Sequence, residues 1–139
     1  MYRMFPSDYL SMDKQPLVLL VEHNLHYLEL LNSYFKRLNW LRICAKQGVK
    51  ALSLAQTHQP NLILLDIALP DLSGLQVIHY LKQNQETRTI PIIGMIASTR
   101  EEDGNNVLLV GADSYISKPC NFYDLEQAIC HHLKLGKIL

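Results

Sequence analysis

The segment PNLILLDIALPDLSG, residues 60–74, decides the fold of this chain. Its apolar part, NLILLD at 61–66, is too uniformly apolar for a strand with one face in water, so it predicts a parallel strand covered on both sides. The strand ends in a carboxylate, Asp66, and Pro70 and Gly74 then mark a loop and the start of a helix. Strand, loop and helix in succession are the repeating unit of a parallel α/β sheet.

Four further strands alternate with helices along the rest of the chain. The predicted strands are LVLLV (17–21), LRICA (41–45), IIGMIA (92–97) and ADSYIS (112–117). Apolar residues at three- and four-residue intervals predict four helices. In chain order, the apolar residues of these helices are Leu25, Leu28, Leu31, Phe35 and Leu38, then Val49, Leu52 and Ala55, then Leu75, Ile78 and Leu81, and finally Leu125, Ile129 and Leu133. This alternation predicts a parallel sheet with helices on both faces.

One helix, over about residues 100–110, has weak support from the sequence. Gly104, Asn105 and Asn106 lie in its middle, and all three have poor helix propensity. We therefore expect a helical segment that is mobile and that Gly111 closes.

The length and composition fit a single domain. The chain has 139 residues and a mass of 16.0 kDa, and its 48% hydrophobic and 19% charged residues are enough to fill a core. We expect an N-terminal extension over residues 1–16, one domain over 17–135 and a short tail over 136–139.

Charge and cysteine content exclude several classes of function. Thirteen basic residues balance thirteen acidic ones, so the chain has no electrostatic footprint for nucleic acid or an anionic membrane. Cys44, Cys120 and Cys130 are an odd number without CxxC spacing, which predicts neither a disulfide framework nor a structural zinc site. No apolar run approaches the ~18 residues that span a bilayer, and we expect a cytoplasmic protein.

Chemistry is expected where the predicted strands end. In open parallel sheets, ligands bind beyond the carboxyl ends of the strands. Glu22 and His23 stand there after the first strand, Asp66 after the third, Ile96 near the end of the fourth and Lys118 after the fifth. Carboxylates beside a lysine can hold a divalent cation and neutralise a phosphoryl group, which is most of what phosphoryl transfer requires.

Four segments of the chain resemble a known family. VLLVEHN (18–24), PNLILLDIALPDLSG (60–74), IPIIGMIA (90–97) and GADSYISKP (111–119) look like the signature segments of the response regulator receiver domain of two-component signalling. The resemblance covers about residues 17–135 in the right order. It implies a flavodoxin-like, doubly wound α/β fold with five helices and the strand order 2-1-3-4-5.

The resemblance also implies roles for individual residues. Asp66 would be the phosphoacceptor, and Lys118 would pair with its phosphate. Glu22, Asp66 and the backbone carbonyl of Ala68 would hold Mg²⁺. Tyr115 stands at the position of the family's switch aromatic, although it could equally be a packed strand residue.

Two positions depart from the family pattern. His23 replaces the second acid of the acidic pair, and Ile96 replaces the Thr or Ser that bonds the phosphoryl group. Since carboxylates beside it would favour a protonated imidazole, one hypothesis is that His23 partly replaces the divalent cation. The other is a weakened preference for Mg²⁺ with Mn²⁺ as a further candidate. Ser98 could substitute for the missing hydroxyl, but a helix cap is the favoured interpretation.

These features favour a stand-alone, atypical response regulator that takes phosphate from a sensor histidine kinase or phosphotransfer protein. It would not be an enzyme, apart from self-catalysed transfer to its own Asp66. Its output would be contacts with a downstream protein on the face of the fourth helix, fifth strand and fifth helix, and a homodimer is a further expectation. The alternative is a pseudo-receiver that binds a partner without phosphorylation. A flavodoxin-like nucleotide binder is disfavoured, because EHNLHYLELL after the first strand lacks glycine.

Overall fold

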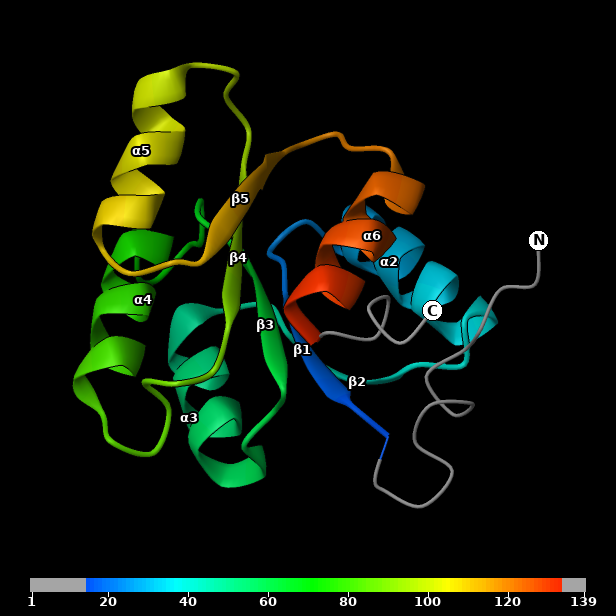
Figure 1. Ribbon diagram of the computed structural model, residues 1–139, viewed down its shortest axis with the longest axis horizontal. Helices are drawn as coiled ribbons and strands as arrows, with labels where there is room; N and C mark the ends of the chain where they lie inside the picture. The colour runs from blue at the N-terminus through cyan, green and yellow to red at the C-terminus, as the bar shows by residue number, and fades with distance from the viewer. Residues whose placement is uncertain (1–14, 134–139) are drawn as a thin grey trace.

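The sheet has the predicted architecture. The structure, a computed structural model, describes residues 15–133, and within them five parallel strands form one sheet in the order β2-β1-β3-β4-β5 (Figure 1). The strands are β1 (Leu17–Val21), β2 (Leu41–Ala45), β3 (Leu62–Asp66), β4 (Ile92–Ile96) and β5 (Ser114–Ser117). The fold class and strand order expected from the sequence are confirmed.

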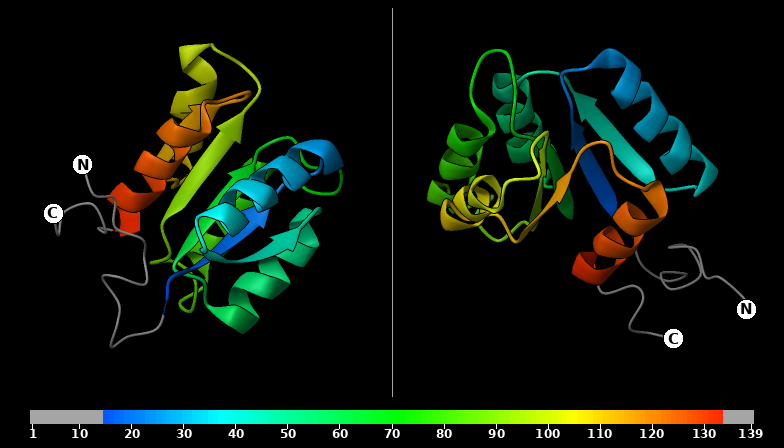
Figure 2. Two further views of the ribbon diagram at one scale, coloured as in Figure 1. Left: turned by 90° about the vertical axis from the view of Figure 1, so that its right-hand side faces the viewer. Right: turned by 90° about the horizontal axis from the view of Figure 1, so that it is seen from above.

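Five helices cover the two faces of the sheet. They are α2 (Leu25–Arg37), α3 (Gly48–His58), α4 (Gly74–Gln83), α5 (Glu101–Leu109) and α6 (Phe122–Leu133). Helices α3, α4 and α5 lie on one face, and α2 and α6 lie on the other (Figures 1 and 2). Alternate residues of β1 and β3 enter the two cores, so both strands are buried throughout, apart from partly exposed Leu17 at the start of β1.

The apolar stripe expected for α3 is wrong at Val49, whose side chain is 60% exposed. The helix instead buries its small residues Gly48, Ala51 and Ala55. Helices α3 and α4 therefore approach closely, and a Cβ at Gly48 would lie 2.9 Å from Cγ2 of Val77. A hydrophobicity pattern alone ranks valine above glycine and so misses a contact that requires the smaller residue.

The helix with weak support from the sequence is present as α5, a regular α-helix. Its poor central propensity is offset at its first turn, where Glu101, Glu102 and Asp103 complement the helix dipole. Packing requires glycine at position 104, because a Cβ there would clash with the ring of Tyr115. Gly104 thus lowers the helix propensity of α5 but allows the helix to pack closely against β5. The mobility expected for this helix stays a prediction.

Gly74 fixes the backbone path of the loop that follows β3. A Cβ on Gly74 would lie 2.5 Å from Cα of Ile67 and 3.0 Å from the carbonyl oxygen of Asp66. Since these are backbone atoms, no side-chain rotation can relieve the clash. We expect Gly74→Ala to lower the free energy of unfolding by about 2–3 kcal/mol, measured by urea denaturation. Ser53→Ala on the exposed side of α3 is the control, and equal stability of the two variants would contradict the prediction.

The domain limits expected at residues 16 and 135 stay a prediction, because 1–14 and 134–139 lie outside the described residues. Among residues 15–133, no helix has the length and apolar character needed to cross a membrane.

Candidate functional site

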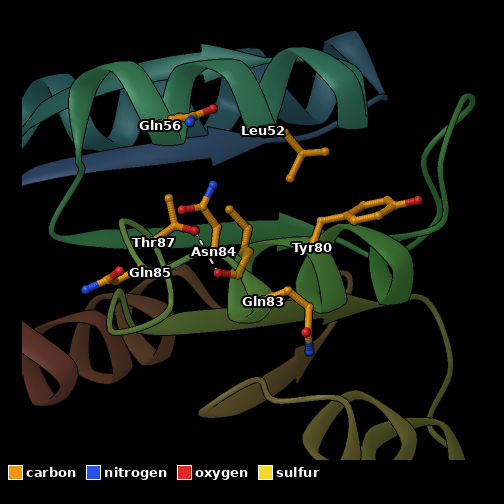
Figure 3. A pocket seen from close by; sticks show the side chains of 8 residues that line it. Leu52, Gln56, Tyr80, Gln83, Asn84, Gln85 and Thr87 are labelled. Atoms are coloured by element: carbon orange, nitrogen blue, oxygen red, sulfur yellow. Dashed lines mark hydrogen bonds between the residues drawn. The ribbon is translucent and has the colours of Figure 1, made fainter.

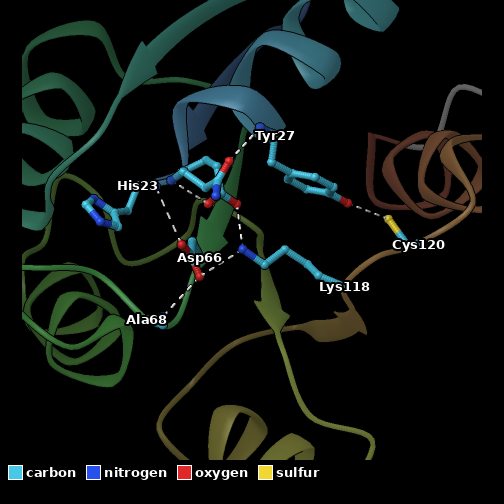
Figure 4. Close-up of polar contacts among 8 residues, drawn as sticks. His23, Tyr27, Asp66, Ala68, Lys118 and Cys120 are labelled. Carbon is cyan, nitrogen blue, oxygen red and sulfur yellow. Dashed lines mark hydrogen bonds and ion pairs between the residues drawn. The ribbon is translucent and has the colours of Figure 1, made fainter.

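Three of the expected site residues meet at the carboxyl ends of the strands. Glu22 follows β1, Asp66 ends β3 and Lys118 follows β5. The Nζ atom of Lys118 lies 2.8 Å from Oε1 of Glu22 and 3.4 Å from Oδ1 of Asp66 (Figure 4). Glu22 is 0% and Asp66 3% exposed. The site is therefore a buried pair of carboxylates bridged by one ammonium group.

Backbone amides orient both carboxylates. The amide of Asn24 donates to Oε2 of Glu22 at 2.9 Å, and the amide of Ala68 donates to Oδ1 of Asp66 at 3.0 Å. The Asn24 side chain in turn caps α2 by accepting from the amide of Tyr27. Short loops after β1 and β3 thus supply the donors that buried carboxylates need.

Burial sets the protonation behaviour of Glu22. Loss of water raises the pKa of its carboxyl above the ordinary value, and the hydrogen bonds from Lys118 and Asn24 oppose this change. The neighbouring Asp66 adds to the rise. Lys118 therefore favours the ionised form of Glu22, in opposition to the effect of burial.

Tyr27 and Cys120 support Lys118, and sequence reasoning missed both. The Tyr27 ring centroid lies 5.2 Å from Nζ of Lys118, and its hydroxyl lies 3.2 Å from Sγ of Cys120. Burial, followed by this contact, raises the pKa of Tyr27. No local pattern joins the two residues, which are far apart in the chain. The only available signal was that Cys120 lies two residues after Lys118.

The sequence interpretation placed the His23 imidazole beside the carboxylates of Glu22 and Asp66, but it does not lie there. Figure 4 shows it turned away from Asp66 and Lys118, and the residue is exposed. Only its backbone amide reaches toward Asp66, at 3.5 Å from Oδ2. The physical reason is that Lys118 already occupies the position where a cation bridges both acids. The imidazole instead lines a neighbouring groove.

The two switch positions lie on β4 and β5, the strands next to α5. Ile96 is 4% exposed in the core between the sheet and α3, α4 and α5. Tyr115 is 37% exposed, and its ring lies against Gly104 on α5. The Ser98 hydroxyl accepts from the amide of Arg100 at 3.0 Å. The cap residue of α5 is Arg100, whose side chain makes no capping hydrogen bond, so the interpretation of Ser98 as the helix cap is wrong.

The carboxylates of Glu22 and Asp66 are candidate ligands for Mg²⁺. In the part of the chain that the structure describes, no three His, Cys, Asp or Glu side chains form a metal-ligand cluster. Mg²⁺ keeps several waters and is often held by one or two carboxylates together with phosphate oxygens. Glu22 and Asp66 supply two buried carboxylates, which lie 2.8 and 3.4 Å from the ammonium group of Lys118. These two residues therefore fit a magnesium ion that is held by two carboxylates together with phosphate oxygens and water.

A separate pocket of about 620 Å³ lies between α3 and the end of α4 (Figure 3). Its lining includes Gln56, Tyr80, Gln83, Asn84 and Gln85, and none of its lining residues is Asp, Glu, His or Lys. Two of the lining residues are joined by a hydrogen bond, since the Thr87 hydroxyl donates to the Leu81 carbonyl at 2.7 Å. This pocket is distinct from the carboxylate and lysine site.

A doubly wound parallel sheet with buried acids and a lysine at its carboxyl edge has the groups that can hold a divalent cation and neutralise a phosphoryl charge. Residues 18–130 match the family model "Response regulator receiver domain", and the chain belongs to this family of two-component signalling domains. Domains of this family are signalling modules rather than enzymes.

Individual relatives agree with this assignment. The chain is 38% identical over 102 residues to the polar-differentiation response regulator DivK of Brucella ovis, covering 73% of this chain and 83% of that protein. A receiver domain of a Pseudomonas aeruginosa sensor histidine kinase, solved with magnesium in its active-site cleft, is similar with a TM-score of 0.80 and 24% identity, over 86% of this chain and 98% of that one.

A second similar structure comes from Saccharomyces cerevisiae. It is the receiver domain of a response regulator in complex with a histidine phosphotransfer signalling protein, and the match has a TM-score of 0.79 and 25% identity. The similarity covers 92% of this chain and 90% of that one.

Proposed function

We propose that this receiver domain accepts a phosphoryl group on Asp66 from the phosphohistidine of a sensor kinase or phosphotransfer protein. The observation that carries the proposal is the position of Lys118, whose Nζ lies 3.4 Å from the Asp66 carboxylate. A fixed ammonium group at that distance can neutralise the charge of an incoming phosphoryl group. The similarity to a receiver solved with its phosphotransfer protein supports the donor class.

In the proposed step, an Asp66 carboxylate oxygen attacks the phosphorus atom while the bond from phosphorus to the donor imidazole nitrogen breaks. The released imidazole keeps the electron pair of that bond and takes up a proton from water. The product is an acyl phosphate on Asp66. The Ala68 amide holds Oδ1 of Asp66, and Lys118 pairs with the phosphate oxygens.

Glu22, Asp66 and the backbone carbonyl of Ala68 would hold Mg²⁺, which supplies further neutralisation of phosphoryl charge when bound. His23 does not add a carboxylate to this set, so we propose that Mg²⁺ binding is weaker than a third acid would give. Mn²⁺ is the further candidate and would use the same oxygen ligands, because the His23 imidazole is turned away from Asp66.

The proposed output is contact with a downstream protein, by a stand-alone cytoplasmic domain. The match to DivK takes up 83% of that response regulator, which supports action without a second domain. The proposed face comprises α5, β5 and α6, where Leu108, Leu109 and Tyr115 are 40%, 82% and 37% exposed. A homodimer through this face would use the same apolar side chains.

A second candidate is a pseudo-receiver that binds its partner without phosphorylation. Ile96 favours it, because its buried side chain has no hydroxyl that could bond a phosphoryl oxygen and so report its presence. In that case Asp66 and Lys118 would serve as a structural ion pair.

Intact mass spectrometry after incubation with a small phosphodonor separates the two candidates. With Mg²⁺ or Mn²⁺, the phosphoacceptor proposal expects a gain of one phosphoryl group that hydroxylamine removes, since hydroxylamine cleaves acyl phosphates. Without metal, the gain should fall at least tenfold. No gain with either metal would favour the pseudo-receiver, and a gain that resists hydroxylamine would contradict Asp66 as its site.

A further inference from the structure

A groove of about 720 Å³ lies beside the phosphoacceptor site, between the start of α2 and the loop from β2 to α3. Its polar lining includes His23, Lys46 and Lys50, and its apolar lining includes Leu25 and Pro70. The groove adjoins the site directly, because the His23 amide reaches toward Asp66 while the His23 imidazole turns outward to line the groove.

The charge of this groove has one sign. None of its lining residues is acidic. Among residues 15–133, neither Lys46 nor Lys50 forms an ion pair. Asp71, in the loop after β3, accepts hydrogen bonds from the amides of Gly48 and Val49 at the start of α3, at 2.7 and 2.9 Å. Its carboxylate is therefore already used to hold the start of the helix.

The groove also presents apolar surface next to these charges. Leu25 is 54% exposed at the first position of α2, although its spacing in the sequence had suggested a buried side chain. An exposed leucine in the same groove as two lysines fits a ligand that carries both carboxylates and an aliphatic group. It does not fit a bare inorganic ion, which would gain nothing from the apolar wall.

We propose that this groove binds an acidic segment of the partner protein that docks beside Asp66, with carboxylates on Lys46 and Lys50 and an aliphatic side chain against Leu25. Binding of this segment would increase the affinity of the domain for its partner and would help to select the correct partner for phosphoryl transfer. The identity of the partner as a phosphodonor rests on the proposed function, whereas binding of an acidic segment does not.

The probe is a blocked peptide of sequence Glu-Leu-Glu-Glu, followed by amide chemical shifts of the protein. We expect shifts concentrated at residues 23–25 and 44–50. We expect at least fivefold weaker binding for Lys46→Gln with Lys50→Gln. The control is Lys36→Gln with Arg88→Gln, which removes the same charge from exposed positions outside the groove and should bind within twofold of the parent. The neutral peptide Gln-Leu-Gln-Gln should bind at least fivefold more weakly.

Three results would overturn the assignment. One is a set of shifts outside the groove, and another is an equal loss of binding in the control variant. The third is displacement of the peptide by inorganic phosphate at the same concentration, which would make the groove a site for free anions. Peptide binding should persist in Asp66→Asn, so a failure of the phosphoacceptor proposal would leave this result intact.

Discussion

Asp66→Asn is expected to abolish phosphorylation of the protein by small phosphodonors. Asparagine keeps the shape of the side chain and an oxygen that can accept from the Ala68 amide, but its neutral amide cannot attack phosphorus as a carboxylate does. The neighbouring Glu22 cannot substitute, because it is 0% exposed and bound to Lys118. Intact mass should show less than one hundredth of the wild-type phosphoryl gain.

The matched control is Asp124→Asn, which removes one acid from the exposed side of α6. It should be phosphorylated within twofold of the wild type. Urea unfolding should place Asp66→Asn within ~1 kcal/mol of the wild type, since Glu22 still pairs with Lys118. Persistent phosphorylation of Asp66→Asn would mean that another residue accepts the phosphoryl group.

Much of the fold was accessible from the sequence for a simple physical reason. The runs at β1, β3 and β4 are continuously apolar, and only a parallel sheet covered on both faces buries such runs. The same reasoning brought Glu22, Asp66 and Lys118 together, because parallel strands place their carboxyl ends at one edge. The distances among these three residues then followed from the fold rather than from any local pattern.

Other features depended on tertiary contacts that no local pattern contains. His23 follows a strand end, where its side chain can face either side, and the presence of Lys118 between the acids decides the outcome. Leu25 fits the period of α2 yet lies beyond the end of the core. The contact of Tyr27 with Cys120 joins the start of α2 to the loop after β5, so it appears only once the sheet is assembled.

Lys118→Met is expected to produce a large loss of stability that depends on pH. The substitution keeps most of the aliphatic stem but leaves Glu22 and Asp66, 0% and 3% exposed, without their bridging cation. Removing one partner from a buried ion pair typically costs about 3–5 kcal/mol. We expect a loss of this size at pH 8 in urea unfolding.

The direction of the pH effect follows from Glu22. Burial raises the pKa of this carboxyl in the folded state above its ordinary value of 4.5, and Lys118 opposes that rise. Without Lys118, the folded protein binds a proton more readily than the unfolded chain in the range above pH 4.5. Stability should therefore fall as pH rises through this range and recover as pH falls toward 5. Lys118→Met should thus be closer to the wild type at pH 5 than at pH 8.

Adding Glu22→Gln to Lys118→Met tests the cause directly. Glutamine removes the buried charge that lost its partner, so the double variant should recover more than half of the stability lost at pH 8. Its remaining loss should vary less with pH, since only Asp66 still carries charge at the site. A loss that is the same at pH 5 and pH 8, and unchanged by Glu22→Gln, would instead assign the role of Lys118 to packing of its stem against Tyr27.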